Sequence, residues 1–307
     1  MYFKISVVLF FLISSACQKE KALVYDSSNS QYLIEAQELK SIIHQDAIKI
    51  IDFRKKEFYN KEHIEGALQM WRTDIEDTTY DYTGVMASPK QIENLFGNLG
   101  INSDDTIVVY DDNGLCEASR LWWILQNYNF KNVKMLHGGI ASWKNMDGKV
   151  TKKIHTIKKS NFKLLGEPKM KYHISKQEML KALENHVVML DTRSFDEFSG
   201  SQQKKGAAKA GRIPNSIHAD WAEAINYHGD HRLKPIKTLE NFYHKKLNVN
   251  KNDSIILYCH SGVRSAHTTF ILTQLLGYKN VRNYDGSWIE WSHFNELPFE
   301  NNFITKN

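Results

Sequence analysis

Cys259 is the residue whose type and setting most clearly indicate chemistry. It follows the apolar run 254–258, which has the composition of a buried β-strand, and it opens the loop 259–265, which leads into a helix-like stretch. In a strand-loop-helix turn of this kind, successive backbone N–H groups converge on one side, and the helix N-terminus adds partial positive charge. Both effects lower the pKa of a thiol below its usual value of about 8.5. The sequence therefore predicts a nucleophilic thiolate at Cys259 rather than an inert buried cysteine.

The chain as a whole has the size and composition of a two-domain protein. It has 307 residues, 42% of them hydrophobic, which is enough for two cores. The net charge is +5, but the basic residues are spread out and form no stripe interleaved with aromatic residues. This pattern argues against nucleic-acid binding, and the mild positive field would draw in small anions.

An internal duplication relates the two halves of the chain. Segment 104–111 matches segment 252–259, and the match ends with Asp111 in the place of Cys259. Asp111 provides no thiol nucleophile, so we expect the first copy to be non-catalytic and the second to be active. The second copy carries about ten extra residues within 200–211, which we interpret as a surface insertion.

Each copy alternates short apolar strands with helical patterns. This order predicts an α/β fold in which each copy forms a parallel sheet with helices on both faces. Ligands of such sheets bind beyond the carboxyl ends of the strands, where Cys259 lies. The strands expected in the first copy are 49–52, 67–70, 106–110 and 133–136. The domain boundaries that follow are 30–148 for the first copy, 149–171 for a Lys-rich linker and 172–299 for the second copy.

The amino terminus has the pattern of an export signal. Residues 1–16 contain a lysine, an apolar run that is too short to span a bilayer, and small residues that immediately precede Cys17. This arrangement resembles the bacterial lipoprotein box, although Ser14 stands where leucine is usual. We expect an exported, periplasmic protein that is anchored to a bacterial membrane by a lipid on Cys17. Plain secretion and a retained short anchor are the alternatives, and all three expose the protein to an oxidising space.

Cys116 and Cys259 are the remaining cysteines. Two cysteines do not make a disulfide framework in a chain of this size. In the duplication Cys116 aligns with Arg264 and not with Cys259, so we expect Cys116 to be a packing thiol.

Four motifs, in order along the chain, resemble those of the tandem-domain rhodaneses, the thiosulfate and 3-mercaptopyruvate sulfurtransferases. The resemblance covers residues 30–299 and implies two tandem rhodanese-like domains, a persulfide carried on the loop cysteine, and no metal or organic cofactor. The matching motifs are 191–194, 211–216, the loop that begins at Cys259, and 285–288.

The resemblance also implies roles for individual residues. Cys259 would take the sulfane sulfur, and Arg193 would hold the donor's sulfonate or carboxylate, since a guanidinium pairs well with oxyanions. Arg264 and His260 are further candidates for substrate binding. The persulfide would be held by the backbone amides of His260, Ser261, Gly262, Val263, Arg264 and Ser265.

The Cys259 loop mixes features of the thiosulfate and 3-mercaptopyruvate branches of the family. We therefore base the expected donor on the positive charge of Arg264. Arg264 at the rim favours a doubly charged thiosulfate over a singly charged 3-mercaptopyruvate, which remains the alternative. We therefore expect a thiosulfate sulfurtransferase that passes sulfur through a Cys259 persulfide to cyanide or a thiol.

Two further functions compete with this reading. A phosphatase or arsenate reductase would also place an arginine after the cysteine, but the Cys259–Arg264 spacing is one residue shorter than in tyrosine-phosphatase-type loops. A non-enzymatic persulfide carrier would share the same loop and would differ only in failing to turn over with small acceptors.

Overall fold

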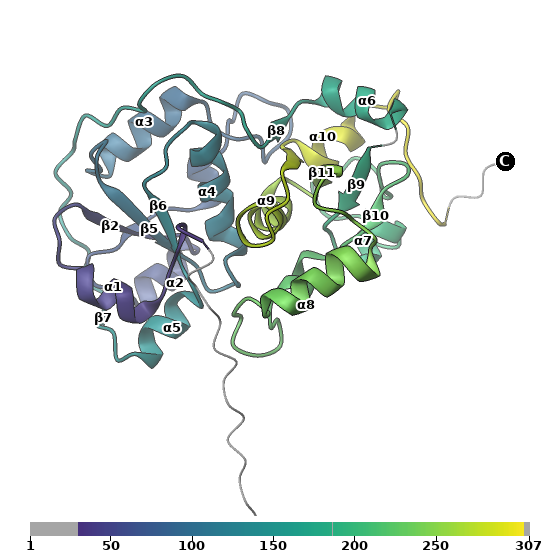
Figure 1. The fold of residues 1–307 in the computed structure, drawn as a ribbon. Coiled ribbons are helices and arrows are strands. Elements are labelled where there is room, and N and C mark those ends of the chain that lie inside the picture. The colour runs from purple at the N-terminus through teal and green to yellow at the C-terminus, as the bar shows by residue number, and fades with distance from the viewer. Residues whose placement is uncertain (1–29, 186, 304–307) are drawn as a thin grey trace, which may run out of the picture.

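The computed structural model describes residues 30–185 and 187–303, which form two α/β domains (Figure 1). The expected export signal and Cys17 lie outside these residues. None of the helices within the described part is both long and apolar enough to cross a membrane.

The first domain contains a parallel five-stranded sheet in the order β1-β6-β5-β2-β4. Its strands are β1 (Leu33–Ile34), β2 (Ile48–Asp52), β4 (Leu68–Gln69), β5 (Thr106–Tyr110) and β6 (Val133–Leu136). Its helices are α1 (Ala36–Ile42), α2 (Lys56–Lys61), the 3₁₀ helix η2 (Arg72–Ile75), α3 (Pro89–Asn98), α4 (Cys116–Asn127) and α5 (Gly139–Asn145). The four strands predicted for this copy are confirmed to within two residues at each end, and β1 was not predicted.

The second domain repeats this arrangement strand for strand. Its sheet has the order β10-β9-β11-β12-β8, so each strand occupies the place of its counterpart in the first domain. The strands are β8 (His173–Ile174), β9 (Val188–Asp191), β10 (Ile217–His218), β11 (Ser254–Tyr258) and β12 (Asn280–Tyr284). The helices are α6 (Lys176–Glu184), α7 (Phe195–Ser199), α8 (Ile236–Glu240), α9 (Val263–Phe270) and α10 (Ser287–His293), with a 3₁₀ turn η3 (Trp221–Ala224) and two π-helical segments, η4 (Asn241–Lys246) and η5 (Ile271–Leu275).

Strand residues alternate between two apolar layers, as the period of a β-strand requires. In β5, Ile107 and Val109 face the layer that holds α3 and α4, whereas Val108 and Tyr110 face the layer that holds α1, α2 and α5. The second domain divides in the same way around β11. The predicted fold, two parallel sheets with helices on both faces, is confirmed.

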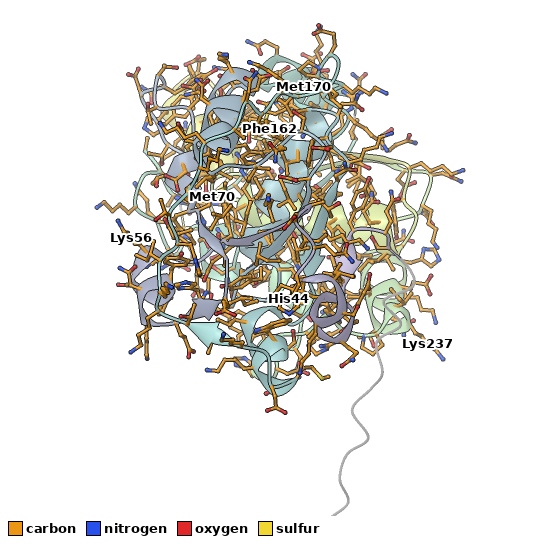
Figure 2. All side chains as sticks on the ribbon, turned by 90° about the vertical axis from the view of Figure 1, so that its left-hand side faces the viewer. His44, Lys56, Met70, Phe162, Met170 and Lys237 are labelled. Atoms are coloured by element: carbon orange, nitrogen blue, oxygen red, sulfur yellow. The ribbon has the colours of Figure 1, made fainter. Side chains whose placement is uncertain are left out.

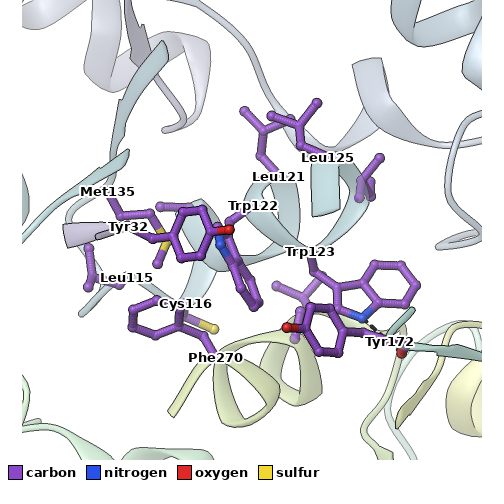
Figure 3. Close-up of a cluster of buried hydrophobic side chains, with 14 of the residues drawn as sticks. Tyr32, Leu115, Cys116, Leu121, Trp122, Trp123, Leu125, Met135, Tyr172 and Phe270 are labelled. Atoms are coloured by element: carbon purple, nitrogen blue, oxygen red, sulfur yellow. Dashed lines mark hydrogen bonds between the residues drawn. The ribbon is translucent and has the colours of Figure 1, made fainter. Parts of the chain in front are cut away.

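One apolar core continues from the first domain into the second. Helices α4 and α9 pack against each other between the two sheets. The Trp122 ring meets the Phe270 ring edge-on at 5.1 Å between centroids and stacks on Tyr172 at 5.7 Å. Figure 3 shows this cluster, in which the Trp123 indole N–H also donates to the Tyr172 carbonyl at 3.1 Å. The interface is therefore a shared core rather than a thin contact.

The segment predicted as a linker, 149–171, packs against the first domain. Its beginning forms β7 (Val150–Thr151), which pairs antiparallel with β3 (His63–Ile64). Further along, Phe162 is buried, with its ring edge-on to Phe96 at 4.9 Å. Figure 2 shows Phe162 within the body of the molecule, in contrast to Lys56, which extends from its edge.

The insertion, residues 200–211, lies at the surface as predicted, with 201–206 exposed, and it also contacts the body of the second domain. The Trp288 indole donates to the Lys209 carbonyl at 3.0 Å, and the Ala208 amide donates to the Ser292 hydroxyl at 3.0 Å. Closer to the loop of interest, His260 Nε2 lies 3.0 Å from the Lys205 carbonyl. The insertion therefore folds back onto α10 and onto the loop that begins with Cys259.

Candidate active site

The Cys259 loop connects β11 to α9, and two of its backbone amides are hydrogen-bonded to the Ser287 hydroxyl. The amides of Cys259 and Gly262 both donate to Ser287 Oγ at 3.1 Å, and this hydroxyl in turn donates to the Tyr284 carbonyl at 2.8 Å. Gly262 has φ +74°, and a Cβ at this position would lie 2.8 Å from the Asp285 carbonyl oxygen. A glycine is needed here both for the left-handed backbone and for the close approach.

The surroundings of Cys259 favour its charged form. The residue is only 1% exposed, and this burial alone would raise the pKa of the thiol. The positive charge of Arg264 opposes burial, as do hydrogen bonds from the Ser265 hydroxyl and from the amides of Ser265 and Ser261, so that the pKa of Cys259 is lowered overall. The Ser265 hydroxyl is buried and forms no other hydrogen bond among the described residues, so it is free to interact with the sulfur.

In the first domain the equivalent loop surrounds a carboxylate, that of Asp111, in place of the thiol. One oxygen of Asp111 accepts from the amides of Asn113 and Leu115 at 3.1 and 3.0 Å, and the other accepts from those of Glu117 and Ala118 at 2.9 and 3.0 Å. Four converging amides thus hold one buried carboxylate. Burial raises the pKa of Asp111 to about 6, and these amides favour its ionised form. The two copies share the loop but differ in the anion that it holds.

Arg264 lies beside the thiol but shares its charge with a carboxylate. Its guanidinium donates to the two oxygens of Glu197, on α7, at 2.6 and 2.9 Å. Burial would raise the pKa of Glu197, but the hydrogen bond and charge of Arg264 lower it to about 2. Substrate binding by Arg264 therefore stays a prediction, and a donor would have to compete with Glu197 for the guanidinium.

Arg193 occupies a different environment from the one that the motif implied. It is 1% exposed, it forms an ion pair with Asp191 at 2.5 Å and it donates to the Gly211 carbonyl at 2.8 Å. The first domain contains the same pair, with Arg54 and Asp52 at 2.6 Å. Because the pair occurs in both copies, we interpret it as structural; substrate binding by Arg193 stays a prediction, and the donor site proposed below does not depend on it.

His260, which the sequence offered as a candidate for substrate binding, is also buried. It is 7% exposed, and its Nε2 contacts the insertion at the Lys205 carbonyl. Burial and the nearby charge of Lys204 lower the pKa of His260 to about 4. The imidazole is therefore neutral near pH 7 and cannot attract a donor by charge.

Other charged residues of the site come from parts of the chain distant from the loop. Arg72, on η2 of the first domain, interacts with the charge of Cys259 and is paired with Glu117. Lys204, in the insertion, interacts with the charges of Cys259 and Arg264. No role was predicted from the sequence for Lys204, Glu197 or Glu117; the available signal was that Glu197 lies just after the motif 191–194. The site thus contains groups from both domains.

The first domain also holds the Cys259 loop in place through Arg120, on α4. The guanidinium forms a buried ion pair with Asp285 at 2.7 Å, and it donates to the carbonyls of Gly84 at 2.8 Å and Gly262 at 3.4 Å. The Met86 amide donates to the other oxygen of Asp285 at 2.9 Å. These contacts tie Gly262 and the neighbouring Asp285 to the first domain.

Cys116 is a packing thiol, as the alignment indicated. It lies in the shared core beside Phe270 (Figure 3), where it is 2% exposed. Burial and the negative charge of Glu117 raise the pKa of Cys116 well above its usual value. Both Cys116 and Cys259 are free thiols. Within residues 30–185 and 187–303, no cluster of His, Cys, Asp and Glu side chains could hold a metal ion.

Comparison with known proteins identifies the repeated domain. The rhodanese-like domain matches residues 35–146 and 175–294. A thiosulfate sulfurtransferase from Corynebacterium glutamicum is 28% identical over 91% of this chain and 94% of its own length. The solved structure of SseA, a 3-mercaptopyruvate sulfotransferase from Escherichia coli, is 25% identical, has a TM-score of 0.73 and is covered over 98% of its length by 84% of this chain.

A third relative shares the fold alone. The anaerobic ergothioneine biosynthesis enzyme from Chlorobium limicola, solved with trimethyl histidine, is 22% identical with a TM-score of 0.76, over 90% of this chain and 71% of that chain.

Proposed function

The chain belongs to the rhodanese family and is a sulfurtransferase, and from this premise we propose that its donor is thiosulfate and its acceptor is cyanide or a small thiol. The observation that carries the proposal is the loop shared by the two copies. In the first copy four amides hold the Asp111 carboxylate, and in the second the equivalent position is a cysteine with a lowered pKa. A site that keeps one side chain negative also favours a persulfide anion at the same place.

The reaction proceeds in two displacement steps through Cys259. The thiolate attacks the outer sulfur of thiosulfate, the sulfur–sulfur bond of the donor breaks, and sulfite leaves with the bonding electrons. This step yields Cys259-S-S⁻. Cyanide then attacks the terminal sulfur, the persulfide bond breaks, and thiocyanate leaves while the Cys259 thiolate is regenerated. The loop amides and the Ser265 hydroxyl stabilise the negative sulfur in each state.

The charges of the site support thiosulfate over 3-mercaptopyruvate. Two arginines near Cys259, Arg264 and Arg72, are each paired with a carboxylate, whereas Lys204 adds a further positive charge. A donor with two negative charges gains about twice the Coulomb energy of a donor with one. The 3-mercaptopyruvate alternative is supported by the similarity to SseA, so the donor must be tested directly.

The burial of Cys259 supports small reactants over a partner protein. At 1% exposure the thiol is nearly closed to solvent, so a bulky partner cannot reach it without a rearrangement of the surrounding residues. This favours an enzyme that acts on small acceptors over a carrier that delivers sulfur to another protein. The bidentate pairing of Arg264 with Glu197 also disfavours a phosphatase, whose arginine would have to bind the phosphoryl oxygens.

Mass spectrometry tests the proposal. After incubation with thiosulfate and removal of excess donor, the peptide that contains Cys259 should gain the mass of one sulfur atom, and cyanide should remove it. Cys259→Ser should lose turnover, whereas Cys116→Ser should retain it. The proposal is wrong if Cys259 gains no sulfur or if Cys259→Ser remains active. Initial rates with both donors, measured side by side, decide between thiosulfate and 3-mercaptopyruvate.

We also propose that the protein is exported to the periplasm and anchored through a lipid on Cys17. The support is the sequence of residues 1–17 alone. The intact mass of protein extracted from membranes tests this, since acylation adds the mass of the lipid and export removes residues 1–16.

A further inference from the structure

The insertion places one unpaired cation at the Cys259 loop. The three arginines discussed for the site each have a carboxylate partner: Arg264 has Glu197, Arg193 has Asp191 and Arg72 has Glu117. Lys204 forms no ion pair within residues 30–185 and 187–303, and it is exposed to solvent. It is thus a cation of the site that an incoming anion can pair with directly, without displacing a carboxylate.

The backbone around Lys204 is held by a tight turn. The Ala207 amide donates to the Lys204 carbonyl at 3.1 Å, and Gly206 has φ +98° at the third position, as a type II turn requires. The next residue in this turn, Lys205, contacts His260 through its carbonyl at 3.0 Å. The turn therefore brings the backbone next to Lys204 into contact with His260, the residue that follows Cys259.

Several charged groups of the site interact electrostatically with Lys204. Lys204 interacts with Arg264, Glu197, Cys259 and Arg72, so that its charge reaches groups from both domains. Burial and repulsion by Arg264 lower the pKa of Lys204. The neighbouring carboxylates do not fully balance the positive charge of the Lys204 ammonium. A bound anion would provide the additional negative charge.

We propose that Lys204 binds the oxyanion end of the sulfur donor and thereby determines the preference of the enzyme for a highly charged donor. The proposal rests on the proposed function, because it requires an anionic donor at Cys259. It assigns to the insertion a substrate-binding role that the resemblance assigned to Arg193. The sulfonate of thiosulfate would lie against the Lys204 ammonium while its outer sulfur meets Cys259.

Substitution of Lys204 provides the test, with Lys205 as a matched control. Lys204→Gln and Lys205→Gln remove the same charge from adjacent exposed side chains, and the contact of Lys205 with His260 is made by its backbone carbonyl. We expect Lys204→Gln to raise KM for thiosulfate roughly 10- to 100-fold, the range for removal of a hydrogen bond to a charged group, with kcat changed less than about twofold. Lys204→Arg should recover most of this loss, and Lys205→Gln should resemble the wild type.

Two further measurements separate substrate binding from a general structural effect. The loss in Lys204→Gln should be larger for thiosulfate than for 3-mercaptopyruvate, and KM should depend less on ionic strength than in the wild type. The proposal is overturned if Lys204→Gln matches Lys205→Gln, or if it lowers kcat at unchanged KM. Failure of the wild type to gain sulfur at Cys259 from either donor would instead refute the proposed function.

Discussion

Replacement of Arg120 by Met tests whether the first domain supports the catalytic loop. The Arg120–Asp285 ion pair spans the two domains at 2.7 Å, and its side chains are 2% and 5% exposed. Removal of the guanidinium leaves the Asp285 carboxylate buried with the Met86 amide as a remaining donor. Breaking a buried pair in this way costs about 3–5 kcal/mol, because an uncompensated charge stays in the interior. We expect the free energy of unfolding to fall by this amount.

The matched control is Arg282→Met. Arg282 pairs with Glu178 at 3.1 Å, but these side chains are 52% and 49% exposed. Loss of an exposed pair costs about 0–1 kcal/mol. The two variants remove the same side chain from the same kind of partner, so the difference between them reports the effect of burial.

Urea unfolding of the full chain, monitored by tryptophan fluorescence, measures both variants. The shared core should make the two domains unfold together, and the slope of the transition should be unchanged if only the native contacts differ. A cost for Arg120→Met that is no larger than for Arg282→Met would refute the reasoning. A second readout is the alkylation rate of Cys259, which should fall in Arg120→Met because the Gly262 carbonyl loses a donor.

Three further outcomes follow from the contacts of the loop. Ser287→Ala leaves the amides of Cys259 and Gly262 without their acceptor, so we expect a loss of about 1–3 kcal/mol in urea unfolding and a higher pH midpoint for alkylation of Cys259, with the label located by peptide mass spectrometry. Gly84→Ala adds a Cβ 2.6 Å from Cβ of Ser261, so sulfur loading should slow relative to Gly66→Ala, which has a similar φ and open space; equal loading rates would contradict the contact. Glu197 has a depressed pKa of about 2, so its pairing should stabilise the protein fully above pH 4.5 and be lost as pH falls towards 2; unfolding curves in which Glu197→Gln shows the same pH dependence would contradict this.

The sequence predicted the elements that have a periodic signal. The strands that became β5 and β6 were predicted with their observed bounds, because a short run with three or four apolar residues is enough to indicate a buried strand. The edge strands β1 and β8 are two residues long, which is too short for any alternation to be visible. The insertion was predicted as a surface loop because its composition is polar, and composition does not report where a loop folds back.

The features of the site that depend on contiguous residues were predicted, whereas those that depend on contacts between distant segments were not. The loop and the exchange of Cys259 for Asp111 were predicted, since both follow from contiguous residues. The environment of Arg193 was not, because an Asp-x-Arg spacing does not say whether the arginine faces a substrate or its own aspartate. The presence of the same pair at Arg54 in the non-catalytic copy was the available signal. Lys204 could not be assigned because its position depends on a turn and on contacts between separate elements.

The packing of α4 on α9 means that neither copy is a self-sufficient folding unit. Each half alone would present an aromatic face to water, with Trp122 uncovered on one fragment and Phe270 on the other. An exposed apolar face of this kind promotes self-association. Fragments split between the copies should therefore be insoluble when produced separately and should regain solubility when produced together. The first copy is thus expected to be required for the folding of the second.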